Sequence, residues 1–210
     1  MLEELVTAAH VLARQGLVTA FGHVSVRVDD TVTITPPDDL ATITVAGLHR
    51  IDLATDTLPA GVPPEAWAHL EIYRSRPDVT AVARAMPPAA FPAAAAAGSI
   101  PVLHGQAAWL GTRIPVHRPA QLLRTSQLAR AAASALGHGS ALLLRGNGAV
   151  TTGGSPGLAV SRMWLVQAAC DTWLRASAAG TPQPLSEEEV QAWQSVSASL
   201  LPRLWRHLSR

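Results

Sequence analysis

The sequence is poor in cysteine and in charge. Cys170 is the only cysteine, so the chain cannot form an internal disulfide, and its place in an apolar helical stretch indicates a buried core thiol. Charged residues make up only 15% of the chain and leave a net charge of +1. The basic residues are scattered rather than gathered on one face, as a nucleic-acid or acidic-membrane surface would require. We therefore expect neither nucleic acid nor membrane as a partner.

Long apolar runs are also missing. A membrane-spanning helix needs about twenty consecutive apolar residues, and the sequence has no such run. The chain does not open with a charged segment followed by an apolar one, because Glu3, Glu4 and His10 interrupt the first helical stretch. We expect a cytoplasmic protein.

What the chain does have is apolar content. Its 210 residues are 48% hydrophobic, which excludes disorder and is enough for one substantial core. We expect residues 1–210 to form a single domain. The low charge further indicates that part of the apolar surface is covered by partner subunits, as in a homo-oligomer.

Hydrophobic periodicity predicts helices that precede, interrupt and follow a set of short strands. Helices are expected over residues 2–14, 64–76, 88–97, 125–137 and 156–180, and after a capping box at Ser186; strands are expected over residues 23–28, 31–35, 48–53, 79–84, 140–144 and 149–152. The first two strands read as a β-hairpin. This order favours an α/β fold of three layers, α/β/α, around a mostly antiparallel sheet.

Four stretches, in this order, carry a resemblance to a known family. They are residues 21–27 (FGHVSVR), Glu65 with residues 69–79 (HLEIYRSRPDV), residues 81–88 (AVARAMPP) and residues 144–150 (LRGNGAV). The chain resembles the class II aldolase/adducin family, which includes sugar-phosphate aldolases and epimerases, decarboxylases and the non-enzymatic adducin head domain. The resemblance implies the three-layer fold and a homotetramer with its site between adjacent subunits, with a dimer as the alternative.

The chain departs from the family at the metal site. By resemblance, the family's metal enzymes hold one divalent ion with three histidines, and the matching positions here are Arg84, Met86 and Asn147. Arginine offers a metal no lone pair, methionine suits copper(I) rather than zinc, and the amide oxygen of asparagine is a poor zinc ligand. We expect no metal at these positions and no cofactor.

The phosphate-binding stretches differ as well. Relatives that act on phosphorylated sugars carry an Asn where this chain has His23, and a Thr-Pro-Ser-Gly turn where it has residues 35–38 (TPPD). Proline has no N–H to offer a phosphate and an aspartate repels it. We therefore expect a substrate without a phosphate group.

Glu65 matches the family's catalytic carboxylate. With Arg84 in place of the metal, we expect a metal-independent lyase or isomerase that decarboxylates, dehydrates or tautomerises a small keto or hydroxy carboxylate. Arg84 would hold the carboxylate or enolate, Asn147 would donate to the developing oxyanion, and Glu65 or His23 would transfer the proton. The expected substrate-binding residues are Ser25, Thr35, Met86 and His104.

Structural explanations compete with each of these roles. Glu65 could be a first-turn carboxylate that complements a helix dipole, Arg84 could form a buried ion pair with Glu65, and Asn147 could be a turn residue. His69 is more typical of a packed or hydrogen-bonded helix residue than of a catalytic one.

Two alternatives concern the whole protein. A metal site rebuilt from His23, His104 and Glu65 would use two histidines and one carboxylate. The chain could also be a non-catalytic homo-oligomer that binds a ligand or a protein, because fold alone does not imply activity. An open cleft lined by Glu65, Arg84 and Asn147 would favour an enzyme, and a closed salt-bridged patch would favour a scaffold.

Overall fold

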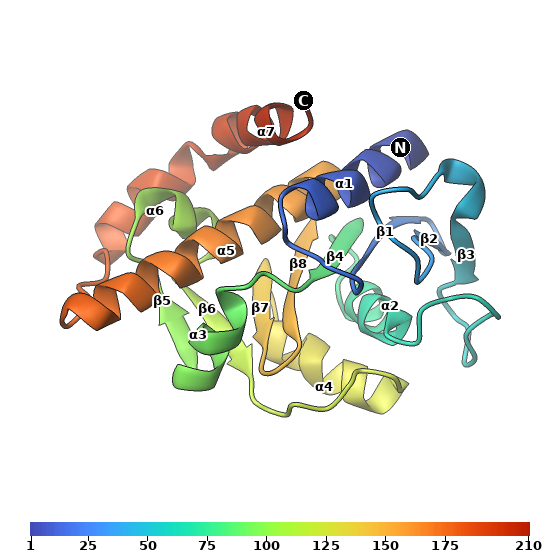
Figure 1. Ribbon diagram of the computed structural model, residues 1–210, viewed down its shortest axis with the longest axis horizontal. Coiled ribbons are helices and arrows are strands. Elements are labelled where there is room, and N and C mark those ends of the chain that lie inside the picture. The colour runs from blue at the N-terminus through green and yellow to red at the C-terminus, as the bar shows by residue number, and fades with distance from the viewer.

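The computed structural model describes the whole chain, Met1–Arg210, and is built around one eight-stranded sheet (Figure 1). The strands are β1 (His23–Val28), β2 (Thr31–Ile34), β3 (His49–Asp52), β4 (Ala81–Ala85), β5 (Ser99–Pro101), β6 (Arg113–His117), β7 (Ala141–Leu144) and β8 (Gly148–Gly153). Their order in the sheet is β3-β2-β1-β4-β8-β7-β6-β5. Only β6 and β7 pair in parallel, so the mostly antiparallel sheet is confirmed.

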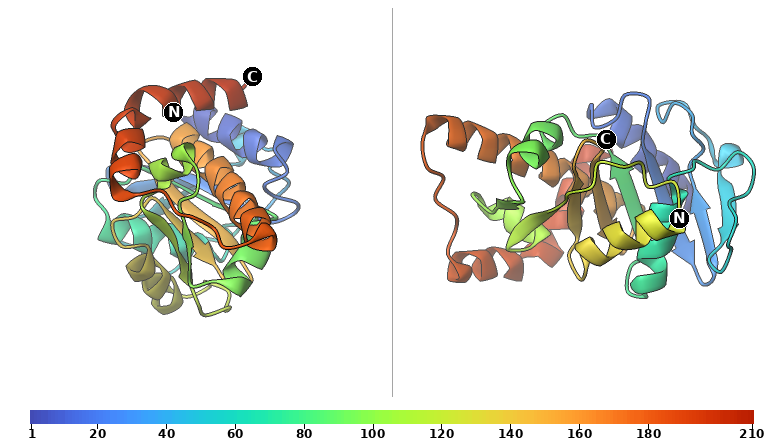
Figure 2. Two further views of the ribbon diagram at one scale, coloured as in Figure 1. Left: turned by 90° about the vertical axis from the view of Figure 1, so that its left-hand side faces the viewer. Right: turned by 90° about the horizontal axis from the view of Figure 1, so that it is seen from below.

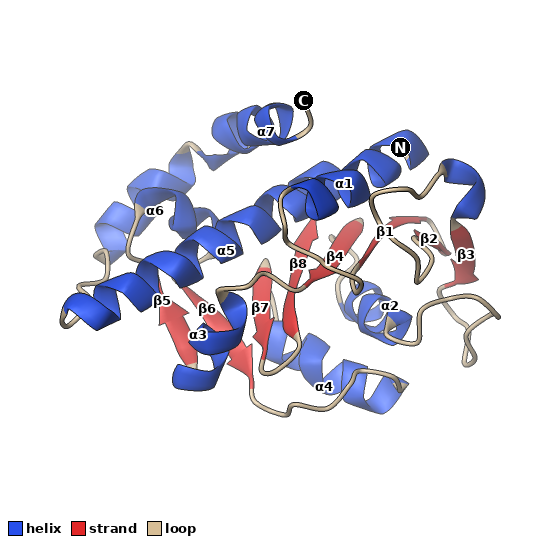
Figure 3. Ribbon diagram, in the orientation of Figure 1, coloured by secondary structure: helices blue, strands red, loops and turns tan.

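Helices cover both faces of the sheet, which makes the three layers visible in Figure 3. The helices are α1 (Leu2–Arg14), α2 (Ala66–Ser75), α3 (Ala90–Ala96), α4 (Ser126–Leu136), α5 (Pro156–Ala179), α6 (Glu187–Ser195) and α7 (Ser197–Leu208). Helices α1, α3 and α5 lie on one face, and α7 packs on the outside of α5. Helices α2 and α4 lie on the other, so the sheet separates α5 from α4 in the left-hand view of Figure 2.

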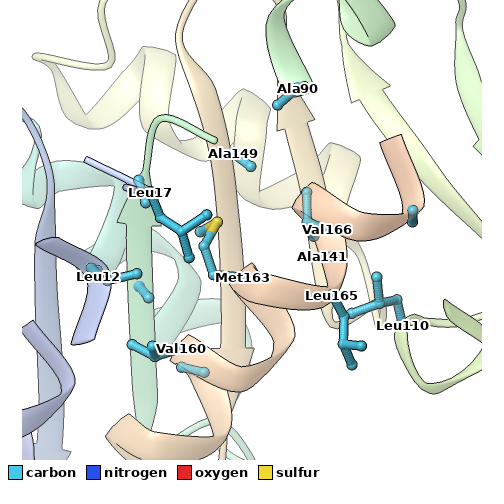
Figure 4. Packing of buried hydrophobic residues seen from close by; sticks show 14 of the residues in the cluster. Leu12, Leu17, Ala90, Leu110, Ala141, Ala149, Val160, Met163, Leu165 and Val166 are labelled. Carbon is cyan, nitrogen blue, oxygen red and sulfur yellow. The ribbon is translucent and has the colours of Figure 1, made fainter. Parts of the chain in front are cut away.

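Strand alternation divides the core into two clusters. In β4, Ala81, Ala83 and Ala85 belong to a cluster of 39 buried residues on the α5 face, whereas Val82 belongs to a cluster of 20 on the α2 face. Figure 4 shows part of the larger cluster, in which Leu12 of α1 and Met163 of α5 lie on the same side of the sheet. Since side chains alternate along a strand, Arg84 shares the α2 face with Val82.

Several local predictions from the sequence are confirmed. Helix α1 has the expected bounds, and α5 begins at Pro156 and ends before Gly180. Of Thr125 and Ser126, the two residues that could cap α4, Thr125 is the cap, and it accepts a hydrogen bond from the backbone N–H of Leu128; Ser186 forms the capping box of α6. Cys170 is fully buried, and burial raises the pKa of its thiol to about 12. No helix is both long enough and apolar enough to span a bilayer.

The predictions missed strands β5 and β6 and helix α7, each of which contains a proline. Strands β5 and β6 contain Pro101 and Pro115, and α7 contains Pro202, so the strand and helix patterns are interrupted at these points. Two 3-10 segments, η1 (Val45–Gly47) and η2 (Gly105–Leu110), also carry no clear periodicity.

The start of α2 differs from the prediction in a way that concerns the site. The helix begins at Ala66, two residues later than expected from Pro64, and Glu65 precedes it without a side-chain capping hydrogen bond. Glu65 is therefore the N-cap residue of α2 rather than a residue of its first turn.

Candidate active site

A cavity of about 410 Å³ opens on the α2 face of the sheet, where β1 begins and β4 ends. Its lining includes five of the residues predicted from the sequence and one that was not predicted: His23, Glu65, Arg84, Met86 and Asn147, together with Arg124. Segments far apart in the chain thus converge at one point of the sheet.

Strand register places the first pair of polar side chains. His23 lies opposite Arg84 in the antiparallel pairing of β1 with β4, and Arg84 lies opposite Val150 in the pairing of β4 with β8. Directly facing residues on one side of a sheet are close neighbours. The imidazole and the guanidinium are therefore brought together by the sheet itself.

A glycine brings the third group to the same place. Asn147 lies in the turn between β7 and β8, and Gly148 after it has a φ of +81°. A Cβ at Gly148 would lie 2.2 Å from the carbonyl oxygen of Ala85, so no other residue allows the turn to sit against the end of β4. This close approach sets Asn147 beside Arg84.

Arg84 is a buried cation without a carboxylate partner. Its side chain is 4% exposed, and Nη2 donates to Oδ1 of Asn147 and, at 3.3 Å, to the Asn147 backbone oxygen. Nε of Arg84 and Nδ2 of Asn147 have no hydrogen-bond partner. Burial lowers the pKa of Arg84, and the charge of Glu65 raises it. Buried charges and donors normally find partners, so this pair is suited to an anionic oxygen of a ligand.

Glu65 forms its ion pair elsewhere. Its Oε1 accepts a hydrogen bond from Nε of Arg124 at 3.1 Å, so the buried Glu65–Arg84 ion pair considered from the sequence is not formed. Nothing local marks Arg124 in the sequence, because it lies in the loop before the α4 cap and is 55% exposed. Only the folding of that loop over the cavity reveals it.

His23 is the outermost member of a buried hydrogen-bonded chain. Its Nδ1 lies 2.7 Å from Nε2 of His69, whose Nδ1 lies 2.6 Å from Oγ of Ser25, and that oxygen lies 2.7 Å from the hydroxyl of Tyr73. Burial lowers the pKa of His69 to about 3, and burial, His69 and Arg84 together hold the pKa of His23 well below its usual value. Both imidazoles are neutral at pH 7.

Three of the expected substrate-binding residues do not line the cavity. Ser25 is fully buried beneath His23, and Thr35 is buried with its hydroxyl accepting a hydrogen bond from the backbone N–H of Val24 at 3.2 Å. His104 lies at the start of η2, after β5 at the far edge of the sheet. The rebuilt metal set of His23, His104 and Glu65 is therefore not assembled.

The three inherited metal positions do not fit a divalent ion either. The guanidinium of Arg84 donates to the side-chain oxygen of Asn147, which is the only oxygen ligand that these positions offer, and Met86 supplies a thioether. No group of three or more His, Cys, Asp or Glu side chains in the chain is arranged to hold a metal ion. These three side chains therefore do not form a site for a divalent ion, because their donor atoms are unsuited to one.

Comparison with known families is consistent with this geometry. Residues 3–174 match the family described as Class II Aldolase and Adducin N-terminal domain. The chain belongs to this family, as the four sequence stretches predicted.

Two curated relatives are both named 3,4-dihydroxyphthalate decarboxylase. The protein from Arthrobacter keyseri is 30% identical over 225 residues, which cover 98% of this chain and 91% of the relative. The protein from Terrabacter sp. (strain DBF63) is 31% identical over 219 residues, covering 95% and 92%. These similarities support a decarboxylase-type lyase that acts on a small carboxylate.

Among solved structures, an L-fuculose 1-phosphate aldolase superposes with a TM-score of 0.84 at 24% identity, covering 92% of this chain and 94% of that one. At this identity the likeness shows the fold alone.

Proposed function

We propose that the protein decarboxylates a small, non-phosphorylated carboxylate that carries a neighbouring keto or hydroxyl group, and that it does so without a catalytic divalent ion. The observation that carries the proposal is the buried guanidinium of Arg84, which faces a cavity and has no carboxylate partner in the chain. The curated relatives named as decarboxylases support the reaction type.

The position of Arg84 suits the charge that the reaction creates. When CO₂ leaves, the electron pair of the broken C–C bond passes to the carbon left behind and is delocalised onto the neighbouring oxygen. A catalyst must bind that oxygen more tightly as its charge grows than it binds the departing carboxylate. Nε of Arg84 and Nδ2 of Asn147 are the buried donors without a partner that are available for this oxygen.

Glu65 is the group in the cavity that can deliver a proton. The carbon that loses CO₂ must gain a proton, and Glu65 is the only carboxyl group among the lining residues. Arg124 holds Glu65 at the mouth and offers its Nη groups to a second anionic group of the substrate. We assign Glu65 the proton transfer, in which its carboxylate takes up a proton from solvent at the cavity mouth and passes it to that carbon, and we assign Arg124 the binding of the second group.

The cavity is open rather than collapsed, which favours an enzyme over a scaffold. Glu65, Arg84 and Asn147 line it without forming a closed ion-paired patch. Two large apolar side chains at its rim, Phe21 and Leu122, are 64% and 46% exposed. We propose that a second copy of the chain covers them in a homotetramer of single-domain subunits, which light scattering can test.

A chelation experiment tests the proposed reaction and its independence of metal together. Untagged protein is dialysed against a chelator, its metal content is measured by mass spectrometry, and CO₂ release from 3,4-dihydroxyphthalate is followed. We expect turnover with substoichiometric metal, and no cleavage of L-fuculose 1-phosphate. Activity that disappears on chelation and returns with zinc or manganese would contradict metal independence, whereas no turnover of any hydroxy or keto carboxylate would contradict the reaction.

A further inference from the structure

The chain of hydrogen bonds from His23 to Tyr73 has a direction that the structure allows us to deduce. All four members, His23, Ser25, His69 and Tyr73, are buried, and each link joins two groups that can both donate and accept. A neutral imidazole has one N–H and one acceptor nitrogen, and each hydroxyl has one proton. The four protons must therefore all point the same way along the chain.

In the first direction, protons point from the cavity toward Tyr73. His23 then donates from Nδ1 to His69, which donates from Nδ1 to Ser25, which donates to the phenol oxygen. The O–H of Tyr73 is then left without an acceptor, because its only side-chain partner is Ser25, the backbone N–H of Val82 beside it is itself a donor, and the residue is buried. A buried donor without an acceptor is unfavourable, because it gives up its hydrogen bond to water and gains none in the folded chain.

In the second direction, every buried proton has an acceptor. Tyr73 donates to Ser25, Ser25 donates to Nδ1 of His69, and Nε2–H of His69 donates to Nδ1 of His23. The one proton left over is on Nε2 of His23. That nitrogen belongs to a residue lining the cavity, so it is available to a ligand.

We propose that His23 presents a neutral Nε2–H to the cavity as a hydrogen-bond donor, and that Tyr73, Ser25 and His69 are positioning residues that hold it in this tautomer. His23 then joins Arg84 and Asn147 as a third donor toward the oxygen that gains charge. The part of this role that concerns turnover rests on the proposed decarboxylation, whereas the tautomer does not.

The same chain prevents His23 from giving its proton away. If Nε2–H were transferred to a substrate, protons would have to move along the chain to restore a neutral imidazole, and Tyr73 would become a phenolate. Burial raises the pKa of Tyr73, so this end state is disfavoured. His23 therefore stabilises negative charge without supplying the proton, which leaves proton transfer to Glu65.

The tautomer can be read directly by NMR. In ¹⁵N-labelled full-length protein at pH 7, two-bond ¹⁵N–¹H correlations show which ring nitrogen carries the proton, and the signals of His23 are assigned by their loss in His23→Asn. We expect the Nε2–H form for both His23 and His69. The Nδ1–H form of both, or a positively charged His23, overturns the proposal whether or not any substrate is turned over.

One variant separates positioning from mere packing. Ser25→Ala removes the donor to Nδ1 of His69, and we expect both tautomers of His23 to appear in the spectrum, with a lower kcat and a similar KM. An unchanged tautomer in this variant would contradict the chain as its cause.

The donor role itself is tested at His23. His23→Asn keeps an N–H at the cavity and His23→Ala does not, so we expect the first to retain activity within about tenfold of the wild type and the second to lose about 100-fold. Equal, large losses in both variants would show that His23 transfers a proton instead.

Discussion

Two arginine-rich places on the α2 face of the sheet treat buried charge in opposite ways. Between α2 and α4, the buried carboxylate of Glu71 accepts hydrogen bonds from Arg74 at 2.7 Å, Ser126 at 2.8 Å and Arg130 at 3.1 Å. At the cavity, Arg84 is equally buried and has no carboxylate partner. The chain can thus neutralise a buried charge where only stability is concerned. No carboxylate of the chain neutralises Arg84, so an external anion is expected to bind there.

The largest expected effect comes from removing the unpaired cation. Arg84→Met should lower the rate of CO₂ release by at least about 100-fold, because the developing oxyanion loses its main donor. The free energy of unfolding should change by less than about 1 kcal/mol, since loss of the hydrogen bond to Asn147 is offset by removal of a buried unpaired charge. Initial rates and urea unfolding measure the two quantities.

Arg84→Lys serves as the control for this variant. It keeps the charge but loses the planar fork of donors, and we expect intermediate activity. A fully active Arg84→Met protein would show that the unpaired cation has no role in catalysis.

At the cluster of Glu71 with Arg74, Ser126 and Arg130, we expect the opposite result, a loss of stability with no loss of activity. Glu71→Gln should lower the free energy of unfolding by about 1 to 2 kcal/mol, because it weakens the hydrogen bonds from Arg74 and Arg130, whose charges remain in contact with water. The turnover of the folded fraction should not change. Arg175→Gln, which breaks an exposed pair with Asp171, is the matched control and should cost less than about 1 kcal/mol. A large loss of specific activity in Glu71→Gln would remove the contrast between the two places.

As the pH falls, the histidines beside the cavity should lose their contribution to stability before the cluster around Glu71 does. His69 has a folded-state pKa of about 3 against an ordinary 6.5, so the unfolded state takes up protons first as the pH falls. Stability is complete above pH 6.5 and declines below it, by about 2 kcal/mol between pH 7 and pH 5 for His69 alone.

The paired cluster should respond only at lower pH. Although burial raises the pKa of Glu71, hydrogen bonds from Ser126, Arg130 and Arg74 lower it below its ordinary 4.5, so its contribution is lost only below that pH. Urea unfolding at a series of pH values, from pH 7 to below 4.5, measures both losses of stability. A flat profile between pH 7 and pH 5 would mean that the buried histidines are not held neutral.

The smallest effect is expected at the rim. Arg124→Gln should raise the KM for a dicarboxylate about tenfold and leave the KM for a monocarboxylate nearly unchanged, because only the second anionic group loses its partner. Stability should be almost unaffected, since this ion pair has one exposed member. Equal changes in KM for both substrates would assign Arg124 to orienting Glu65 instead.

Much of the fold followed from local patterns. The alternation in residues 23–28, the cap at Thr125 and the capping box at Ser186 each specify an element through nearby residues, and the structure has all three. Where proline interrupts the pattern, as in β5, β6 and α7, the element depends on contacts with distant segments and was missed. Glu65, Arg84 and Asn147 were named from their place in the family motifs, and all three line the cavity.

The order of residues alone shows that histidine is missing from the three inherited metal positions, because a residue's metal-binding chemistry is a property of its side chain. It could not show that Glu65 pairs with Arg124 rather than with Arg84. Nor could it show that His23 is hydrogen-bonded to a chain of buried side chains formed by His69, Ser25 and Tyr73. Those pairings join residues between 44 and 59 positions apart. They depend on how β1, α2 and the loop before α4 pack together, and hydrogen bonds act only over distances that packing decides.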